Sequence, residues 1–177
     1  MNKKIAAIFF VSFSYAFVRY HIAGPVPAKE ILFILNKALS LSIMFSMLMM
    51  LRAKEKPEKK LIFNWITVLI SAHIILSLIL LRPHYFPAFF DKDEAFTLIG
   101  NLALAGGIIS AVLMLMGSKI PFSYSFKYVF GIFISLHLIA MGWESWFKPS
   151  SWYGYLPPIT LLSFLLFLIW FFRKKES

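Results

Sequence analysis

The chain has 177 residues, of which 60% are hydrophobic, a mean hydropathy of +0.77 and a formal net charge of +10. Soluble domains are about half apolar, so this composition predicts an integral membrane protein whose basic residues report topology rather than nucleic-acid binding. Cysteine is absent, which excludes disulfide exchange, iron–sulfur ligation by cysteine and a thiol nucleophile.

Six apolar runs follow one another along the chain. A membrane-spanning helix needs roughly 17 to 25 apolar residues, and the sixth run is the shortest. The segments between the runs carry charge or turn residues, for example "RAKEKPEKK" and "GSKIPFSYS". We therefore predict an all-α fold, a six-helix transmembrane bundle that forms a single integral membrane domain over residues 1–177. The runs lie near residues 5–22, 31–51, 61–81, 96–116, 126–143 and 159–172.

The basic residues predict the orientation of these spans. Of the 18 Lys and Arg residues, 12 lie at the two chain ends and around the second and fourth connections. Cytoplasmic segments are enriched in Lys and Arg, so we expect both termini in the cytoplasm of a multi-pass protein of the cell membrane. Trp143, Trp146 and Trp152 fall at the opposite, outer end, as in an aromatic belt.

The first run has a second interpretation as a signal peptide, because Lys3 and Lys4 precede an apolar core. Its removal would leave five spans. The run continues into "RYHIAG" without a clean small-x-small cleavage site, and six spans satisfy the charge rule. We therefore favour a retained first span.

Two histidines interrupt apolar sequence, His73 in "SAHIILSLILL" and His137 in "FISLHLIAMGW". At 1.5 Å per residue both lie about 10 to 14 Å below the outer boundary, on spans that run in the same direction. Matched depth on two helices suits one planar ligand held from both faces, and haem iron accepts axial imidazoles. The alternative is that each histidine only hydrogen-bonds a neighbouring helix. A closed zinc site is disfavoured, because no carboxylate accompanies the pair.

Other polar residues lie nearer the outer boundary. Lys37 and Arg19 are candidate contacts for haem propionates, or side chains that snorkel to lipid headgroups. His21 and His84 fall at the boundary itself and are expected to be surface residues, with a metal ion or a second porphyrin as alternatives. In the fourth span, four small residues share one face, which ordinary helix packing explains. They are Gly100, Ala103, Gly107 and Ala111.

At these residues the chain resembles the ferric-reductase-like transmembrane family, which includes the haem-binding membrane subunit of the methionine sulfoxide reductase system. The resemblance covers roughly residues 30–145. It implies a six-helix bundle that binds b-type haem with His73 and His137 as axial ligands. It rests on "NKALSLS", "AHIILSLILL", "RPHYFPAFF" followed by "GNLALAGGI", and "KYVFGIFISLHLIAMGW".

The sequence departs from that family in two ways. Members with two stacked haems carry a second histidine about 13 residues earlier in the fifth span, where this chain has Tyr124. We therefore expect one haem b, near the outer face. No glycine-rich nucleotide fingerprint is found either, so the electron donor is expected to be a separate cytoplasmic flavoprotein or quinol.

These observations predict a membrane b-type cytochrome that transfers electrons to ferric iron or a partner reductase at the outer face. The chain would then be a ferric-reductase-like oxidoreductase or its haem-binding subunit. One alternative is the substrate-binding membrane subunit of a small vitamin or metal importer, and another is a structural membrane protein without a ligand. A visible haem spectrum separates the first function from the other two.

Overall fold

The computed structural model describes residues 2–25, 30–117 and 124–173. Six helices in this part of the chain are long and apolar enough to cross a membrane, which confirms the predicted all-α, six-span fold. The π-helix η1 (Phe17–Ile22) extends the first helix, and the 3-10 turns η3 (Pro87–Phe89), η4 (Pro149–Ser151) and η5 (Tyr153–Tyr155) lie in the connections. The six helices are α1 (Asn2–Ala16), α2 (Ile31–Arg52), α3 (Lys56–Ile79), α4 (Leu98–Met116), α5 (Tyr124–Trp146) and α6 (Ile159–Phe172).

The beginning of α3 differs most from the expected boundary. The apolar run begins at Leu61, whereas the helix begins at Lys56. Hydropathy indicates where the chain enters lipid. The helix itself can extend beyond the lipid into water, as far as the residues there are compatible with helical backbone geometry. Pro57 is compatible with the first turn, where its missing N–H has no intrahelical partner to lose.

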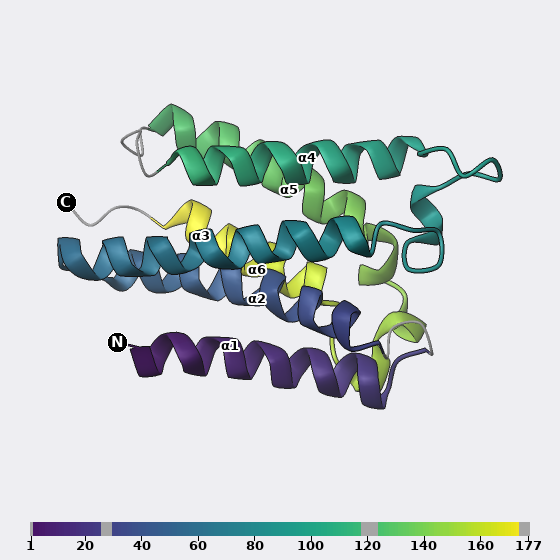
Figure 1. Ribbon diagram of the computed structural model, residues 1–177, viewed down its shortest axis with the longest axis horizontal. Helices are drawn as coiled ribbons and strands as arrows, with labels where there is room; N and C mark the ends of the chain where they lie inside the picture. Colours follow the sequence, from purple (N-terminus) through teal and green to yellow (C-terminus); the bar gives the residue numbers. More distant parts are fainter. Residues whose placement is uncertain (1, 26–29, 118–123, 174–177) are drawn as a thin grey trace.

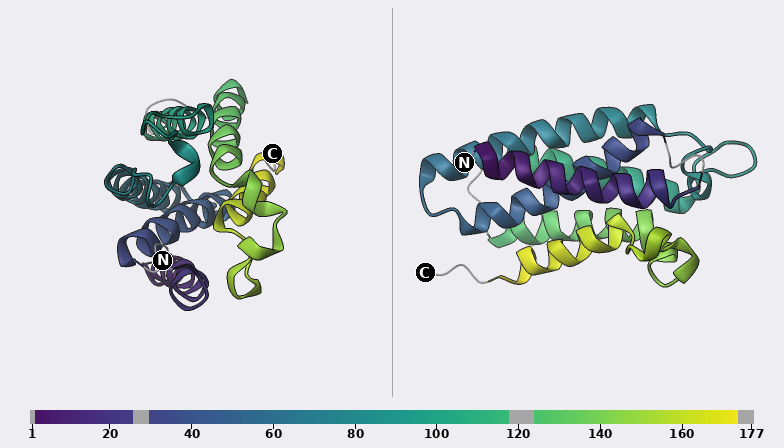
Figure 2. Two further views of the ribbon diagram at one scale, coloured as in Figure 1. Left: turned by 90° about the vertical axis from the view of Figure 1, so that its right-hand side faces the viewer. Right: turned by 90° about the horizontal axis from the view of Figure 1, so that it is seen from below.

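The helices form a bundle in which α2 is central (Figure 1). It packs against α1, α3 and α6, while α4 packs mainly against α5, and α6 contacts both α2 and α5. Contacts between α3 and α4 are few. The end-on view shows α3 and α4 as neighbours on one side of the bundle, with α6 on the opposite side (Figure 2). The bundle therefore consists of an α1–α2–α3 group and an α4–α5 pair joined through α6.

The first helix begins and the last helix ends at the same end of the bundle. The beginning of α1, the end of α6 and the α2–α3 connection all lie at that end (Figure 1). This agrees with an even number of spans. The cytoplasmic location of that end remains a prediction from the distribution of basic residues.

Small residues allow the central helices to approach closely. Ser12 and Ala16 of α1 are fully buried, as are Ala38 and Ser42 of α2. Membrane helices use such residues where their backbones come together, because lipid supplies no hydrophobic driving force between them. The close approach of α1 and α2 therefore depends on small side chains as well as on apolar ones.

The three outer tryptophans have different environments. Trp143 is exposed, as an aromatic belt requires, whereas Trp146 is buried and its indole N–H donates to Thr160 Oγ1 at 2.9 Å. Trp152 donates to the backbone oxygen of Trp146 at 3.2 Å. Trp146 therefore forms part of the α5–α6 interface, and its assignment to the belt was wrong.

Candidate functional site

A pocket lies between the α2–α3 and α4–α5 pairs, with α6 contributing at one side. Its empty volume is about 1250 Å³, including the part that is open to the surroundings. The lining is predominantly apolar, with a few polar groups, as is usual for sites of organic ligands. Both His73 and His137 line it.

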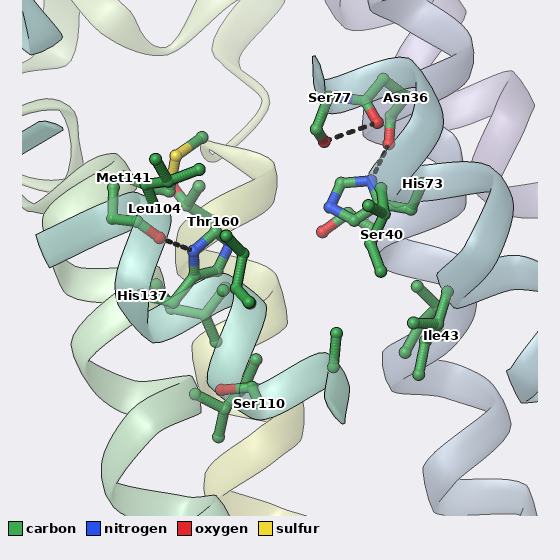
Figure 3. Close-up of a pocket in the computed structure, with 18 of the residues that line it drawn as sticks. Asn36, Ser40, Ile43, His73, Ser77, Leu104, Ser110, His137, Met141 and Thr160 are labelled. Carbon is green, nitrogen blue, oxygen red and sulfur yellow. Dashed lines mark hydrogen bonds between the residues drawn. The ribbon is translucent and has the colours of Figure 1, made fainter. Parts of the chain in front are cut away.

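The two imidazoles face each other across this pocket (Figure 3). His73 projects from α3, and its Nδ1 lies 3.2 Å from the backbone oxygen of Asn36 in α2. His137 projects from α5, and its Nδ1 lies 2.7 Å from the backbone oxygen of Ala103 in α4. A carbonyl oxygen can only accept, so each Nδ1 carries the proton and donates it. Each Nε2 then presents an unprotonated lone pair to the pocket.

This arrangement is the one that metal-ligating histidines usually show. A hydrogen bond from the second ring nitrogen to a carbonyl oxygen fixes the tautomer and the orientation of the ring. Both histidines have such a bond, and each takes its carbonyl from the neighbouring helix of its own pair. The sequence singled out the two histidines as candidate ligands, but not the carbonyls that orient them.

The His73 side of the pocket contains a small polar network. The side-chain oxygen of Asn36 accepts a hydrogen bond from Ser77 Oγ at 3.3 Å, and Ser77 lies one helical turn after His73. Asn36 therefore contacts α3 twice, through its backbone oxygen and through its side chain. Sequence reasoning missed both residues, although a polar residue four positions from a buried histidine was a usable signal.

The His137 side depends on close approach of α4 and α5. A Cβ added to Gly106 would lie 3.0 Å from the backbone nitrogen of His137 and 3.0 Å from the Phe133 oxygen. A Cβ added to Gly107 would lie 2.8 Å from His137 Nδ1. The small face of the fourth span therefore does more than ordinary packing, because Gly107 leaves the room that the imidazole occupies.

Lys37 is a buried cation at the pocket. Only 8% of its surface is exposed, and its Nζ lies 5.0 Å from the Phe33 ring centre and 5.2 Å from that of Phe86. Among the described residues, no carboxylate lines the pocket with it. Burying a charge is expensive unless an opposite charge or aromatic faces compensate it. Lys37 thus gives the pocket an attraction for an anionic group.

Arg19 lies elsewhere. It is not among the pocket-lining residues, and its two terminal nitrogens donate to the backbone oxygens of Leu156 and Ser151. Its guanidinium also lies 5.0 Å from the ring centre of Tyr153. Arg19 therefore connects the end of the first span to the segment before α6. These contacts explain why Arg19 is buried, and no haem propionate is needed as its partner. Of the two candidate cations, only Lys37 lines the pocket.

His21 and His84 do not line the pocket either. His21 is exposed and stacks on Phe17, with ring centres 4.6 Å apart. His84 Nε2 lies 3.7 Å from a carboxylate oxygen of Glu30, whose other oxygen accepts a hydrogen bond from the Tyr85 hydroxyl. That hydrogen bond raises the pKa of Tyr85, because it holds the phenolic proton. Both histidines are surface residues, as expected.

The donor set of the pocket fits haem b. It offers two oriented imidazoles on opposite walls, an apolar lining and one buried cation, and haem needs only the two nitrogen ligands. Within the described ranges, no three His, Asp or Glu side chains come together as a candidate metal site. No protein-family model, curated protein or solved structure matches this chain. The resemblance to the ferric-reductase-like family therefore remains a prediction.

Proposed function

We propose that the protein is a membrane b-type cytochrome that passes electrons to an acceptor at the outer face. The observation that carries this proposal is the facing pair of His73 and His137, each with Nδ1 bonded to a backbone carbonyl and Nε2 directed into one pocket. When bound, haem b supplies a one-electron redox couple. The resemblance to ferric reductases supports the same chemistry.

The chain's own groups have separable tasks in this proposal. His73 and His137 supply Nε2 ligands whose ring orientation is fixed from α2 and α4. The apolar side chains around them exclude water. Lys37 is a candidate partner for a propionate, because it is buried at the pocket without a lining carboxylate. The exclusion of water and the local charge are the features through which a protein adjusts a haem potential.

The depth of the site supports an acceptor at the outer face. Only six residues separate His73 from the end of α3 at Ile79, or about 9 Å at 1.5 Å per residue. Toward the beginning of α3 at Lys56, 17 residues separate them, or about 25 Å. The acceptor, ferric iron or a partner reductase, would approach by the shorter path. A cytoplasmic flavoprotein or quinol remains the proposed donor.

Membrane vesicles of known orientation test this function. In right-side-out vesicles the reduced protein should be reoxidised rapidly by ferricyanide, which does not cross the bilayer. In inside-out vesicles the same reagent should act much more slowly, because the longer path separates it from the site. Equal rates in both preparations would contradict an outer-face exit. A protein purified without haem would favour the importer subunit instead, since Lys37 and an apolar pocket also suit a small organic anion.

A further inference from the structure

The pocket extends to the lipid-facing surface between α3 and α4. Ile74 and Leu78 of α3 line it from one side, and Leu104 and Ile108 of α4 line it from the other. Each pair is four residues apart, so each forms a continuous strip on one helix face. Leu78 is 57% exposed and Ile108 is 48% exposed, although both line the pocket. The same side chains therefore border the interior and the bilayer.

The other helix boundaries around the pocket are closed by packing. The pairs α2–α3, α4–α5, α2–α6 and α5–α6 are all in extensive contact, whereas α3 and α4 touch at few points. Toward the inner end the lining side chains Met47, Met114 and Phe130 are almost completely buried. Of the boundaries formed by the described residues, the one between α3 and α4 is the least closed.

The outer end of the pocket is covered by an aromatic cap. Phe86 and Phe89, from the connection between α3 and α4, both line the pocket and stack with ring centres 5.2 Å apart and planes 8° apart. Thr97 fixes this connection, since its N–H donates to the Phe89 oxygen at 2.9 Å and its hydroxyl donates to the Ala88 oxygen at 2.9 Å. A ligand that came from the outer water would have to displace this cap.

We propose that the gap between α3 and α4 is a lateral portal through which a lipid-dissolved ligand enters the pocket. The rim is aliphatic, so it suits a largely apolar molecule and repels a hydrated one. Lys37 on the far wall selects for an anionic group on that molecule by charge complementarity. The ligand class is therefore an amphipathic organic anion that partitions into the bilayer. The portal goes beyond the proposed function, because it concerns the route and not the redox chemistry.

An apolar photoreactive probe tests the portal without haem. The full chain is reconstituted in lipid nanodiscs, and a small apolar diazirine dissolved in the bilayer is photolysed and mapped by peptide mass spectrometry. We expect label on Met44 and Met114, which line the pocket and are buried from the surface. The variant Leu78→Trp/Ile108→Trp should lose most of that label, because the larger rings close the rim.

A matched control is the variant Ile132→Trp/Ile169→Trp. Both residues are exposed aliphatics on α5 and α6 and neither lines the pocket, so labelling should equal that of the wild type. The variant Leu78→Ala/Ile108→Ala widens the rim and should increase labelling, which tests the portal even if the tryptophan variant fails to fold. Unlabelled Met44 and Met114 in the wild type, or equal labelling in rim and control variants, would overturn the portal.

Haemin uptake adds a second measurement that separates the two proposals. Haemin delivered in lipid vesicles should bind the wild-type and Ile132→Trp/Ile169→Trp proteins at the same rate. It should bind the Leu78→Trp/Ile108→Trp variant several-fold more slowly, with the same final spectrum. Unchanged uptake by the rim variant would contradict the portal. If no variant bound haemin, the cytochrome function would fail while the diazirine result still decided the portal.

Discussion

The two halves of the pocket hold equivalent imidazoles in different ways. On the α2–α3 side, His73 lies among polar side chains, where Ser77 donates to the Asn36 side chain and Asn36 accepts from His73 through its backbone. On the α4–α5 side, His137 bonds the Ala103 backbone where Gly106 and Gly107 let the helices approach. The backbone carbonyl is common to both. The same backbone hydrogen bond is therefore accompanied by polar side chains beside His73 and by close helix packing beside His137.

The surroundings of His73 and of His137 should be sensitive to different substitutions. A hydrogen bond between membrane helices contributes about 0.6 kcal/mol on average, so the loss of one polar side chain has a small effect. An extra methyl group in a closely packed site costs about 1 to 3 kcal/mol. We therefore expect the His137 side to be sensitive to added volume and the His73 side to tolerate the loss of a hydroxyl.

The largest effect is expected from His73→Ala and His137→Ala, which remove the feature that the two halves share. Each should convert a low-spin bis-imidazole spectrum into a high-spin one or abolish haem binding, because the iron loses an axial ligand. Visible absorption of the purified variants measures this. His21→Ala and His84→Ala are the controls and should leave the spectrum unchanged, since neither residue lines the pocket.

Gly107→Ala tests whether close packing of α4 against α5 holds the His137 ring. The new Cβ would lie 2.8 Å from Nδ1, so the ring must move and its bond to the Ala103 oxygen must lengthen. Overpacking of about 1 to 3 kcal/mol corresponds to roughly a 5- to 150-fold weaker retention of haem. Gly131→Ala is the control, because its Cβ would lie 2.7 Å from the Phe171 ring and 3.5 Å from the Phe167 ring, and neither ring lines the pocket. Equal haem titrations for the two variants would rule out the steric role of Gly107.

Lys37→Met removes the buried positive charge that α2 contributes to the pocket. Removal of a buried cation should lower the midpoint potential, because the cation favours the reduced, more negative state of the site. We expect a fall of about 40 mV, equivalent to about 1 kcal/mol. Redox titration measures it, with Lys92→Met on the exposed connection as a control for net charge. An equal shift of the midpoint potential in both variants would show that Lys37 acts only through the net charge and not from within the pocket.

The smallest effect is expected from Ser77→Ala. This variant loses the hydrogen bond to the Asn36 side chain but keeps the bond from His73 to the backbone. The free energy of haem binding should change by about 0.6 kcal/mol or less. Ser71→Ala is the control, since Ser71 bonds only within its own helix. A loss of haem as large as that of Gly107→Ala would show that the polar network, and not the backbone, orients His73.

Hydropathy and depth predicted the scaffold and the histidine pair. Apolar runs define spans because length and polarity are local properties. The estimated depths of His73 and His137 on two parallel spans predicted that the two histidines meet, and both line one pocket. The neighbours of each helix were not predictable, since contact between α4 and α5 depends on packing over the whole bundle. Contacts between helices also decide which carbonyls bond the histidines, what Gly107 does and where Arg19 lies. The sequence alone therefore could not assign these features.

The proposed function requires that His73 and His137 ligate one haem iron. The reduced-minus-oxidised visible spectrum of the purified wild-type chain, together with its haem content, tests this requirement directly. We expect the sharp bands of a low-spin b-type haem at one haem per chain. A colourless protein, or a spectrum without low-spin bands after expression with ample haem, would contradict it.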